Sequence, residues 1–221
     1  MPHRVLRIAP TLFVLLALSA ITLGLWAILN RPMLEPDWPD QVAGYAYSPY
    51  RDGQDPLRGI HPSREEIRQD LELLSGQTRR IRTYSVDGIL GEIPEIARPL
   101  HMQVTVGAWL SGDYLQNAIE IEKLIRIANA NPNVDRVIVG NEVLLRQELS
   151  VEKLVEYLRY VKAQVKVPVS TAETWVLWQQ NPALARESDF IAAHFLPYWE
   201  GESLDTANDY IAGIHLAMTK A

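Results

Sequence analysis

The segment Val137-Ile-Val-Gly-Asn141-Glu142 is a short apolar run that ends in a glycine, an amide and a carboxyl group. β-Branched residues in such a run favour a buried strand. The carboxyl ends of parallel strands are where α/β proteins place functional residues. A carboxyl group held there against an apolar wall can keep its proton near neutral pH and act as a general acid. Taken alone, Asn-Glu is a common dipeptide, and a solvated loop carboxylate is the alternative.

Short strand-like runs lie on both sides of this segment. Strands are expected at residues 42–47, 80–84, 103–107, 134–140, 167–171 and 190–194. Between them, Ser63-Arg-Glu-Glu66 is a capping box that opens a helix over 63–75. Ser150 can cap a helix over 151–165, and residues 204–221 also show a helical period.

A further helix is expected over residues 113–130. Its apolar positions recur with a helical period, and they are expected to face the core: Leu115, Ile119, Leu124 and Ile127. Glu120 is expected on the solvated face, together with the other charged residues of this helix.

Alternation of strand and helix indicates βαβ units and a parallel sheet, which leaves an open doubly wound sheet or a closed barrel. The first strand is followed by Ser48-Pro49-Tyr50-Arg51 instead of a glycine-rich phosphate loop, which argues against a dinucleotide-binding fold. We therefore expect an α/β fold of the (β/α)8 TIM-barrel type over residues 41–221. A barrel needs about 250 residues, so an incomplete barrel of about six βα units is expected.

The N-terminal residues 1–30 have the composition of a membrane anchor. Arg4 and Arg7 precede an uncharged apolar run at 11–29, long enough to cross the roughly 30 Å core of a bilayer. A cleaved signal peptide is the alternative, although its apolar region usually runs only about 7–15 residues. The arginines predict a single-pass protein of the inner membrane with its domain facing the periplasm. Three prolines predict a stiff spacer at 31–40.

Composition excludes several classes of function. The net charge is −6, whereas nucleic-acid binding needs a concentrated basic face, so no nucleic-acid partner is expected. The chain has no cysteine, which excludes thiolate metal sites and cysteine nucleophiles. The histidines are scattered without metal-site spacing, and neither a metal nor a cofactor is expected. A neutral substrate fits this composition.

Four strand-end segments together resemble family 17 glycoside hydrolases, most closely the bacterial branch of β-1,3-glucanases and β-glucan synthases. These segments are Ala43-Gly-Tyr-Ala-Tyr-Ser-Pro-Tyr50, Ile81-Arg-Thr-Tyr84, Val139-Gly-Asn-Glu142 and Ala192-Ala-His-Phe-Leu-Pro-Tyr-Trp199. The resemblance implies that Glu142 is the catalytic acid/base and that Asn141 holds the sugar near its 2-hydroxyl. It also implies a nucleophilic glutamate on a seventh strand, and this sequence contains no matching motif.

Other residues are candidates for substrate binding. Tyr84 and Tyr198 follow strand ends and offer flat faces on which sugar rings stack, although core packing is the alternative for any single aromatic residue. His194 is either a hydrogen-bonding cleft residue or a satisfied residue inside the barrel. Glu173 either binds substrate at the rim or sits at a helix N-terminus, where the helix dipole favours a carboxylate.

The sequence thus predicts a retaining β-glucan-active glycoside hydrolase or transglycosylase that carries the acid/base half of its site, with a β-glucan poly- or oligosaccharide as its partner. Retention needs two carboxyl groups about 5–5.5 Å apart, so whether this chain is itself an enzyme is left open. The alternatives are a catalytically inactive, membrane-tethered glucan-binding remnant and an incomplete gene model.

Overall fold

The computed structural model describes residues 5–31 and 39–220. They fall into two units, Met1–Pro39 and Asp40–Ala221. Most of the expected spacer, including Pro32 and Pro36, lies outside the described residues, as does Arg4.

The described part of the first unit contains the helix α1 (Val5–Leu29), with Pro10 inside it. Its segment Ala9–Leu29 has 21 residues and a mean hydropathy of 2.5, so it is a candidate membrane span by length and composition. A signal sequence meets the same criterion. The apolar side chains of this segment are exposed, as a lipid-facing helix requires.

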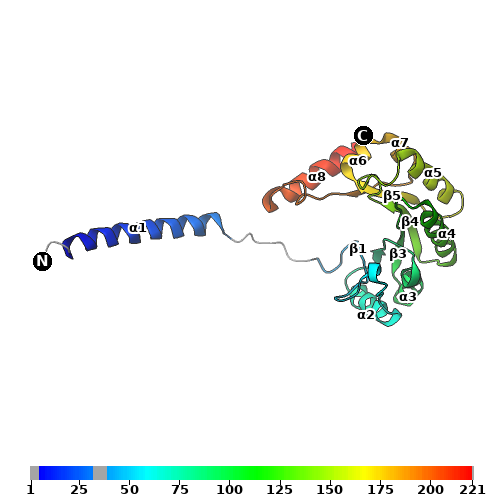
Figure 1. Cartoon of the computed structure of the whole chain (residues 1–221), viewed down its shortest axis with the longest axis horizontal. Coiled ribbons are helices and arrows are strands. Elements are labelled where there is room, and N and C mark those ends of the chain that lie inside the picture. The colour runs from blue at the N-terminus through cyan, green and yellow to red at the C-terminus, as the bar shows by residue number, and fades with distance from the viewer. Residues whose placement is uncertain (1–4, 32–38, 221) are drawn as a thin grey trace. The chain divides into compact units, whose positions relative to one another are not determined.

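The second unit is built on six parallel strands that hydrogen-bond in chain order (Figure 1). They are β1 (Tyr45–Ala46), β2 (Arg80–Arg82), β3 (Gln103–Ala108), β4 (Val134–Asn141), β5 (Val169–Thr174) and β6 (Ala192–His194). Sequential order is the order of a barrel, whereas a doubly wound sheet reverses direction at a switch point. The barrel-type prediction is therefore supported, as a six-stranded half-barrel within the described residues.

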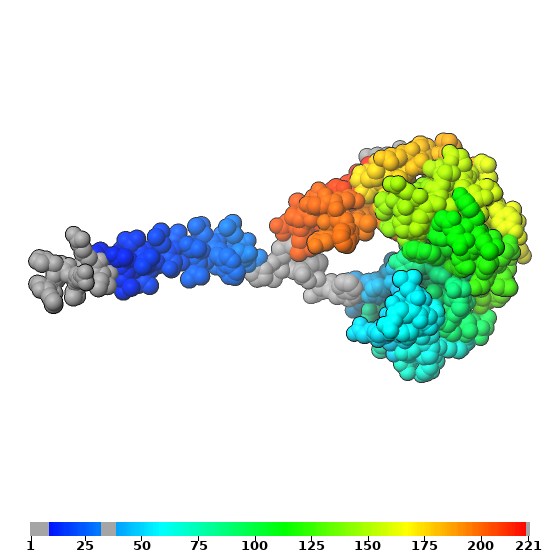
Figure 2. Space-filling model, in the orientation of Figure 1, coloured from blue at the N-terminus to red at the C-terminus, as the bar shows by residue number. Residues whose placement is uncertain are grey.

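The helices of this unit alternate with the strands. The long ones are α2 (Arg64–Ser75), α4 (Tyr114–Ala130), α5 (Val151–Lys162) and α8 (Leu204–Lys220). The short ones, which the sequence pattern did not predict, are η1 (Pro56–Arg58), η2 (Gly88–Glu92), α3 (Ile93–Ala97), η3 (Arg98–Leu100), α6 (Trp175–Gln180) and α7 (Pro182–Glu187). Figure 1 shows α3, α4 and α5 on the convex side of the curved sheet. In the space-filling view this unit is hollowed on its concave side (Figure 2).

Local chemistry sets where the helices begin. The Ser63 hydroxyl accepts from the Glu66 amide while the Glu66 carboxylate accepts from the Ser63 amide, so the capping box at the start of α2 is confirmed. The Ser150 hydroxyl accepts from the Lys153 amide at the start of α5. Leu154 and Leu158 of α5 are fully buried in the core.

The strands differ from their predicted bounds: β3 and β4 are each one residue longer, and β2 ends at Arg82 instead of residue 84. β5 begins at Val169 instead of residue 167 because Pro168 has no N–H to donate; its carbonyl oxygen accepts from the Val137 amide at 3.0 Å. β5 continues to Thr174 because its last residues pair with β6. β1 and β6, at the two edges of the sheet, are shorter than expected.

The expected buried face of α4 is correct for Leu124 and Ile127, which pack in or against the core, and wrong for Leu115 and Ile119. Leu115 is 74% exposed and Ile119 is 42% exposed. The buried face instead carries Asn117 and Glu120 beside Ile121, Leu124 and Ile125. Loop partners satisfy both polar side chains: the Asn117 amide group bonds the backbone of Ser111, and Glu120 accepts bonds described below. Burial of hydrogen-bonded polar groups overrides the apolar pattern.

Candidate active site

Glu142 stands directly after β4 at the concave face of the sheet. Its backbone has a φ of +52°, a left-handed conformation that is uncommon outside glycine. Two bonds hold the turn: the Glu142 amide donates to the Ala172 carbonyl at 2.7 Å, and the Arg146 amide donates to the Glu142 carbonyl at 2.9 Å. Such backbone strain persists where surrounding structure imposes it, and it concentrates at functional sites.

Glu142 is joined to His194, at the end of β6. The His194 ring nitrogen Nδ1 lies 2.5 Å from Glu142 Oε1, and the other ring nitrogen, Nε2, lies 3.1 Å from Arg82 Nη1. A guanidinium can only donate hydrogen bonds, so Nε2 is the acceptor and Nδ1 carries the proton toward Glu142. Glu142 Oε1 is therefore occupied as an acceptor, which leaves Oε2 as the oxygen able to carry a proton.

Arg82 links three strands at this point. From β2, its Nη2 donates to Asn141 Oδ1 at 2.6 Å, and its guanidinium carbon lies 4.7 Å from the centre of the Tyr84 ring. Burial lowers the pKa of Arg82, while nearby Tyr84 and Glu142 oppose that effect, and arginine stays charged in proteins. Because Asn141 Oδ1 accepts from Arg82, its Nδ2 amide is left to donate to a ligand.

The structure thus brings together four of the six predicted site residues: Glu142, Asn141, His194 and Tyr84. Both ring nitrogens of His194 bond neighbouring side chains, and its contact with a ligand stays a prediction. Arg82 belongs to the same cluster but was not predicted. The sequence could have placed Arg82 there, because side chains alternate between the two faces of a strand. Ile81 of β2 is buried on one face, so its neighbour Arg82 points to the other, concave face.

Glu173 lies on β5 beside this cluster but not at an exposed rim. Its exposed fraction is 0%, and its Oε1 accepts from the Leu144 amide at 2.8 Å, so it holds the turn that follows Glu142. Burial raises the pKa of Glu173 to about 7, and the negative charge of Glu142 adds to the rise, while the hydrogen bond from Leu144 opposes it. The prediction that Glu173 binds substrate at the rim is corrected, because the loop after β4 covers it.

Tyr198 stands apart from the cluster. It is 81% exposed, and its ring meets Trp199 edge-on, with 5.4 Å between ring centres. Beside it, the Glu200 carboxylate accepts from Trp175 Nε1 at 3.0 Å, which ties this loop to the start of α6. Tyr198 therefore forms part of an exposed aromatic surface beyond β6 and makes no hydrogen bond to Glu142 among the described residues.

Known proteins resemble this chain in sequence. The BtgE/BtgC glycoside hydrolase domain family matches residues 44–221. Glucan 1,3-beta-glucosidase of Schizosaccharomyces pombe is 28% identical over 166 residues, which cover 68% of this chain and 51% of that protein. The probable glucan endo-1,3-beta-glucosidase btgC of Aspergillus terreus is 23% identical, over 88% of this chain and 32% of that protein. The chain thus spans about half or less of these relatives.

Solved structures show the same fold. An active-site mutant of the Rhizomucor miehei beta-1,3-glucanosyltransferase in complex with laminaritriose matches with a TM-score of 0.70 and 26% identity, over 81% of this chain and 66% of that one. A crystal structure of the glycoside hydrolase family 17 beta-1,3-glucanosyltransferase from the same organism matches with a TM-score of 0.66. The chain belongs to the BtgE/BtgC glycoside hydrolase domain family, of the glycoside hydrolase family 17 type.

Proposed function

We propose that residues 44–221 form the acid/base half of a retaining site that acts on β-1,3-glucan, with Glu142 as the acid/base. The cluster of Glu142, His194 and Arg82 at the carboxyl ends of three strands carries this proposal. The names of the relatives, which are β-1,3-glucosidases and a β-1,3-glucanosyltransferase, support the substrate class.

The geometry gives each residue a task. Glu142 Oε2 would protonate the oxygen of the leaving sugar, because Oε1 is held by His194. Asn141 Nδ2 would donate to a sugar hydroxyl, because Arg82 fixes the orientation of the amide group. Tyr84, whose ring lies against the Arg82 guanidinium, would offer a flat face to a sugar ring.

Hydrolysis also needs a second carboxylate across the sugar. Among the described residues Glu173 is the carboxyl group next to Glu142, and it is fully buried and bonded to the turn after β4. In this buried, hydrogen-bonded position Glu173 is not placed to attack a sugar. This observation favours, as the second candidate function, a membrane-tethered protein that binds glucan without cleaving it.

A laminarin digest tests the need for a second carboxylate. The full 221-residue chain is incubated with laminarin, beside the Glu142→Gln variant, and released sugars are measured. We expect no release from either protein. Release by the unmodified chain that the variant lacks would show that a second carboxylate is present after all, with Glu173 as the first residue to test.

Hydrolysis and transfer differ only in whether water or a second sugar intercepts the glycosyl-enzyme, and the proposal covers both. The assignment to the bacterial branch rests on the resemblance of the motifs and stays a prediction, since the relatives compared above are fungal.

We also propose that α1 is an uncleaved anchor that places residues 41–221 outside the cytoplasm. The 21-residue apolar segment Ala9–Leu29 supports this. A reporter enzyme fused after Ala221 should be active in the periplasm and remain with the membrane fraction. Soluble protein that begins near Ile21 would instead show a cleaved signal peptide.

A further inference from the structure

The Arg146 side chain joins the segments at the ends of β3 and β4. Its Nη2 donates to the Leu110 carbonyl oxygen at 2.6 Å, and its Nη1 donates to the Asn141 carbonyl oxygen. Leu110 lies just after the end of β3, and Asn141 is the last residue of β4. One planar guanidinium thus bonds the backbone of two neighbouring strand ends, which an ammonium group on a flexible stem cannot match.

Other contacts hold the guanidinium in this orientation. Its Nε and Nη2 donate to Glu148 Oε2 at 2.9 and 2.7 Å, and its central carbon lies 4.4 Å from the centre of the Trp109 ring. The Arg146 side chain is 24% exposed. Because a carboxylate, two carbonyl groups and an aromatic face all contact it, the guanidinium is held in one position.

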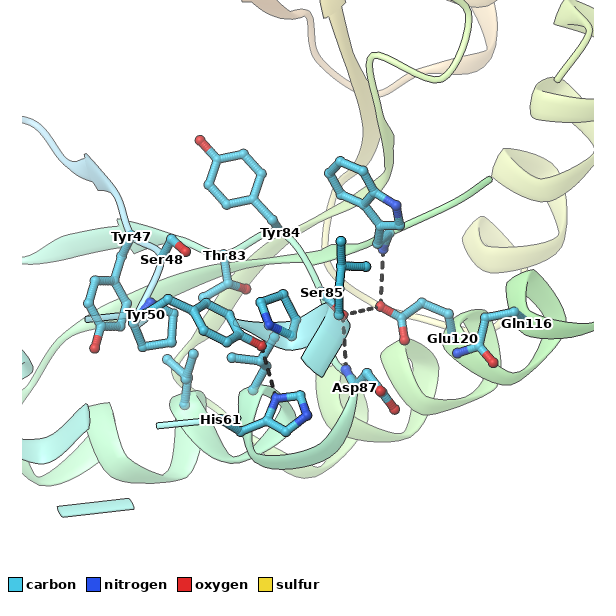
Figure 3. Close-up of a pocket in the computed structure, with 16 residues that line it drawn as sticks. Tyr47, Ser48, Tyr50, His61, Thr83, Tyr84, Ser85, Asp87, Gln116 and Glu120 are labelled. Atoms are coloured by element: carbon cyan, nitrogen blue, oxygen red, sulfur yellow. Dashed lines mark hydrogen bonds between the residues drawn. The ribbon is translucent and has the colours of Figure 1, made fainter. Parts of the chain in front are cut away.

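The segment after β3, to which Arg146 bonds, is itself held in place by Glu120. This residue of α4 is 1% exposed, and its Oε1 accepts from the Ser85 hydroxyl at 2.5 Å, the Val86 amide at 3.0 Å and the Trp109 amide at 3.1 Å. Figure 3 shows the bond between Ser85 and Glu120. One buried carboxyl group therefore ties together the segments that leave β2 and β3, so Arg146 bonds a fixed point.

Arg146 also bonds both peptide groups that flank the Cα atom of Glu142. The Asn141 carbonyl precedes this atom and accepts from the Arg146 side chain, whereas the Glu142 carbonyl follows it and accepts from the Arg146 amide at 2.9 Å. Glu142 needs such support because its φ of +52° is uncommon outside glycine. Since the flanking peptide groups are planar, holding them fixes the direction in which the Glu142 side chain leaves the backbone.

We propose that Arg146 is a positioning residue for proton transfer by Glu142. It holds the Glu142 backbone in the conformation that directs Oε2 toward the leaving oxygen, while His194 occupies Oε1 at the other end of the side chain. This inference rests on the proposed function and deepens it, because it adds a residue that acts through Glu142 without touching the substrate. Misplacement of a catalytic group by about 1 Å can cost on the order of a hundredfold in rate.

Arg146→Lys tests this inference in the full chain in detergent micelles, with azide as an external nucleophile. Azide forms a bond to the anomeric carbon of a nitrophenyl β-laminaribioside, and the phenolic oxygen leaves with the electron pair of the broken bond. Proton transfer from Glu142 speeds the departure of 4-nitrophenol, whereas 2,4-dinitrophenol leaves without a proton. We expect Arg146→Lys to slow 4-nitrophenol release by about tenfold to a hundredfold and dinitrophenol release by less than about threefold.

Further variants separate the position of Glu142 from the stability of the fold. In Glu142→Gln the proton donor is already absent, so adding Arg146→Lys should slow 4-nitrophenol release by less than about twofold further. Arg159→Lys, at an exposed ion pair of α5, is the matched control and should change neither rate. Glu148→Gln keeps Arg146 but removes the charge of its partner, and it should slow 4-nitrophenol release selectively, to a smaller extent.

Distinct results separate this inference from the proposed function. Equal slowing of both phenols by Arg146→Lys would overturn the inference, and so would an unchanged rate of 4-nitrophenol release. If thermal unfolding shows that Arg146→Lys does not fold, an unchanged 4-nitrophenol rate in Glu148→Gln overturns the inference instead. The proposed function survives these results if Glu142→Gln still slows 4-nitrophenol release selectively. Release of neither phenol by the unmodified chain would overturn the two together.

Discussion

His194 Nδ1 lies 2.5 Å from Glu142 Oε1, although 52 positions separate the two residues in the sequence. The contact joins the ends of β4 and β6, two strands that do not pair with each other. Their side chains meet because the curvature of the sheet turns its strand ends toward one point on the concave side. The same curvature brings Arg82 from β2 to His194.

Removal of the His194 ring should destabilise the folded chain. His194→Ala leaves Glu142 Oε1 and Arg82 Nη1 without their shared partner, at side chains that are largely buried. The loss of hydrogen bonds to charged groups should lower the melting temperature by about 2–10 °C. Thermal unfolding of the full chain in micelles, followed by tryptophan fluorescence, measures this melting temperature. His215→Ala, at an exposed histidine of α8, is the control, and equal melting of the two variants would contradict a role for His194 in the cluster.

Arg82 should not tolerate replacement by lysine. One guanidinium bonds both His194 and Asn141 and also lies against Tyr84, whereas an ammonium group on a flexible stem cannot match this planar fork. Arg82→Lys should therefore weaken laminaribiose binding, measured by calorimetric titration of the full chain in detergent micelles, by about tenfold or more. Arg159→Lys, at an exposed ion pair on α5, is the matched control. Unchanged affinity in Arg82→Lys would show that the orientation of Asn141 does not depend on Arg82.

Glu173 should make stability depend on pH. Its folded-state pKa is raised to about 7 from the ordinary 4.5, so the folded chain holds the proton over a pH range in which the unfolded chain has released it. Stability should therefore fall as the pH rises from 4.5 to 7, by about 3 kcal/mol across this window from this one group. Between pH 4.5 and 7 the melting temperature should fall less steeply in Glu173→Gln than in the unmodified chain. Glu156→Gln, at an exposed glutamate of α5, is the control and should keep the pH dependence of the unmodified chain. If the melting temperature of Glu173→Gln falls with pH as steeply as that of the unmodified chain, Glu173 is not the group responsible.

Close approach of β2 and β3 requires glycine at position 107. A Cβ atom added there would lie 2.4 Å from the Thr83 carbonyl oxygen. This oxygen belongs to the backbone, which cannot move aside as the end of a flexible side chain can. Gly107→Ala should destabilise the fold by roughly 2–4 kcal/mol, as overpacked cores do. Gly213→Ala, in α8 with open space around the added atom, should instead stabilise by about 0.5–1 kcal/mol. A Gly107→Ala variant that melts like the unmodified chain would contradict the tight packing of these two strands.

Much of the fold follows from local pattern. The strands were predictable because short strand-like runs alternate with helical patterns along the chain. The starts of α2 and α5 were predictable because a capping serine bonds an amide only a few residues away. The buried face of α4 was not predictable from its own residues. Glu120 is buried because Ser85, Val86 and Trp109 bring donors from two distant loops, and no periodicity within the helix records them.

The residues of the candidate site also divide into those that the sequence predicted and those that it missed or misplaced. Asn141 and Glu142 were found because a strand ends in them, and His194 and Tyr84 because they close two other strands. Arg82 was missed because its importance depends on partners from β4 and β6. Tyr198 was placed in the cleft because it follows β6, but the chain turns there and exposes the ring.

The central claim is that Glu142 acts as a general acid, and the dependence of glycoside cleavage on the leaving group tests it most directly. Azide supplies the nucleophile that the described site lacks: it forms a C–N bond at the anomeric carbon as the bond to the leaving oxygen breaks. A 4-nitrophenyl β-laminaribioside has the poorer leaving group and is cleaved faster when Glu142 protonates the leaving oxygen, whereas the 2,4-dinitrophenyl glycoside departs without a proton.

With azide, the unmodified chain should release both phenols and form an α-configured glycosyl azide. Glu142→Gln should release dinitrophenol at nearly the rate of the unmodified chain and 4-nitrophenol much more slowly. Release of 4-nitrophenol by Glu142→Gln at the rate of the unmodified chain would contradict the assignment, and so would the absence of any release by the unmodified chain.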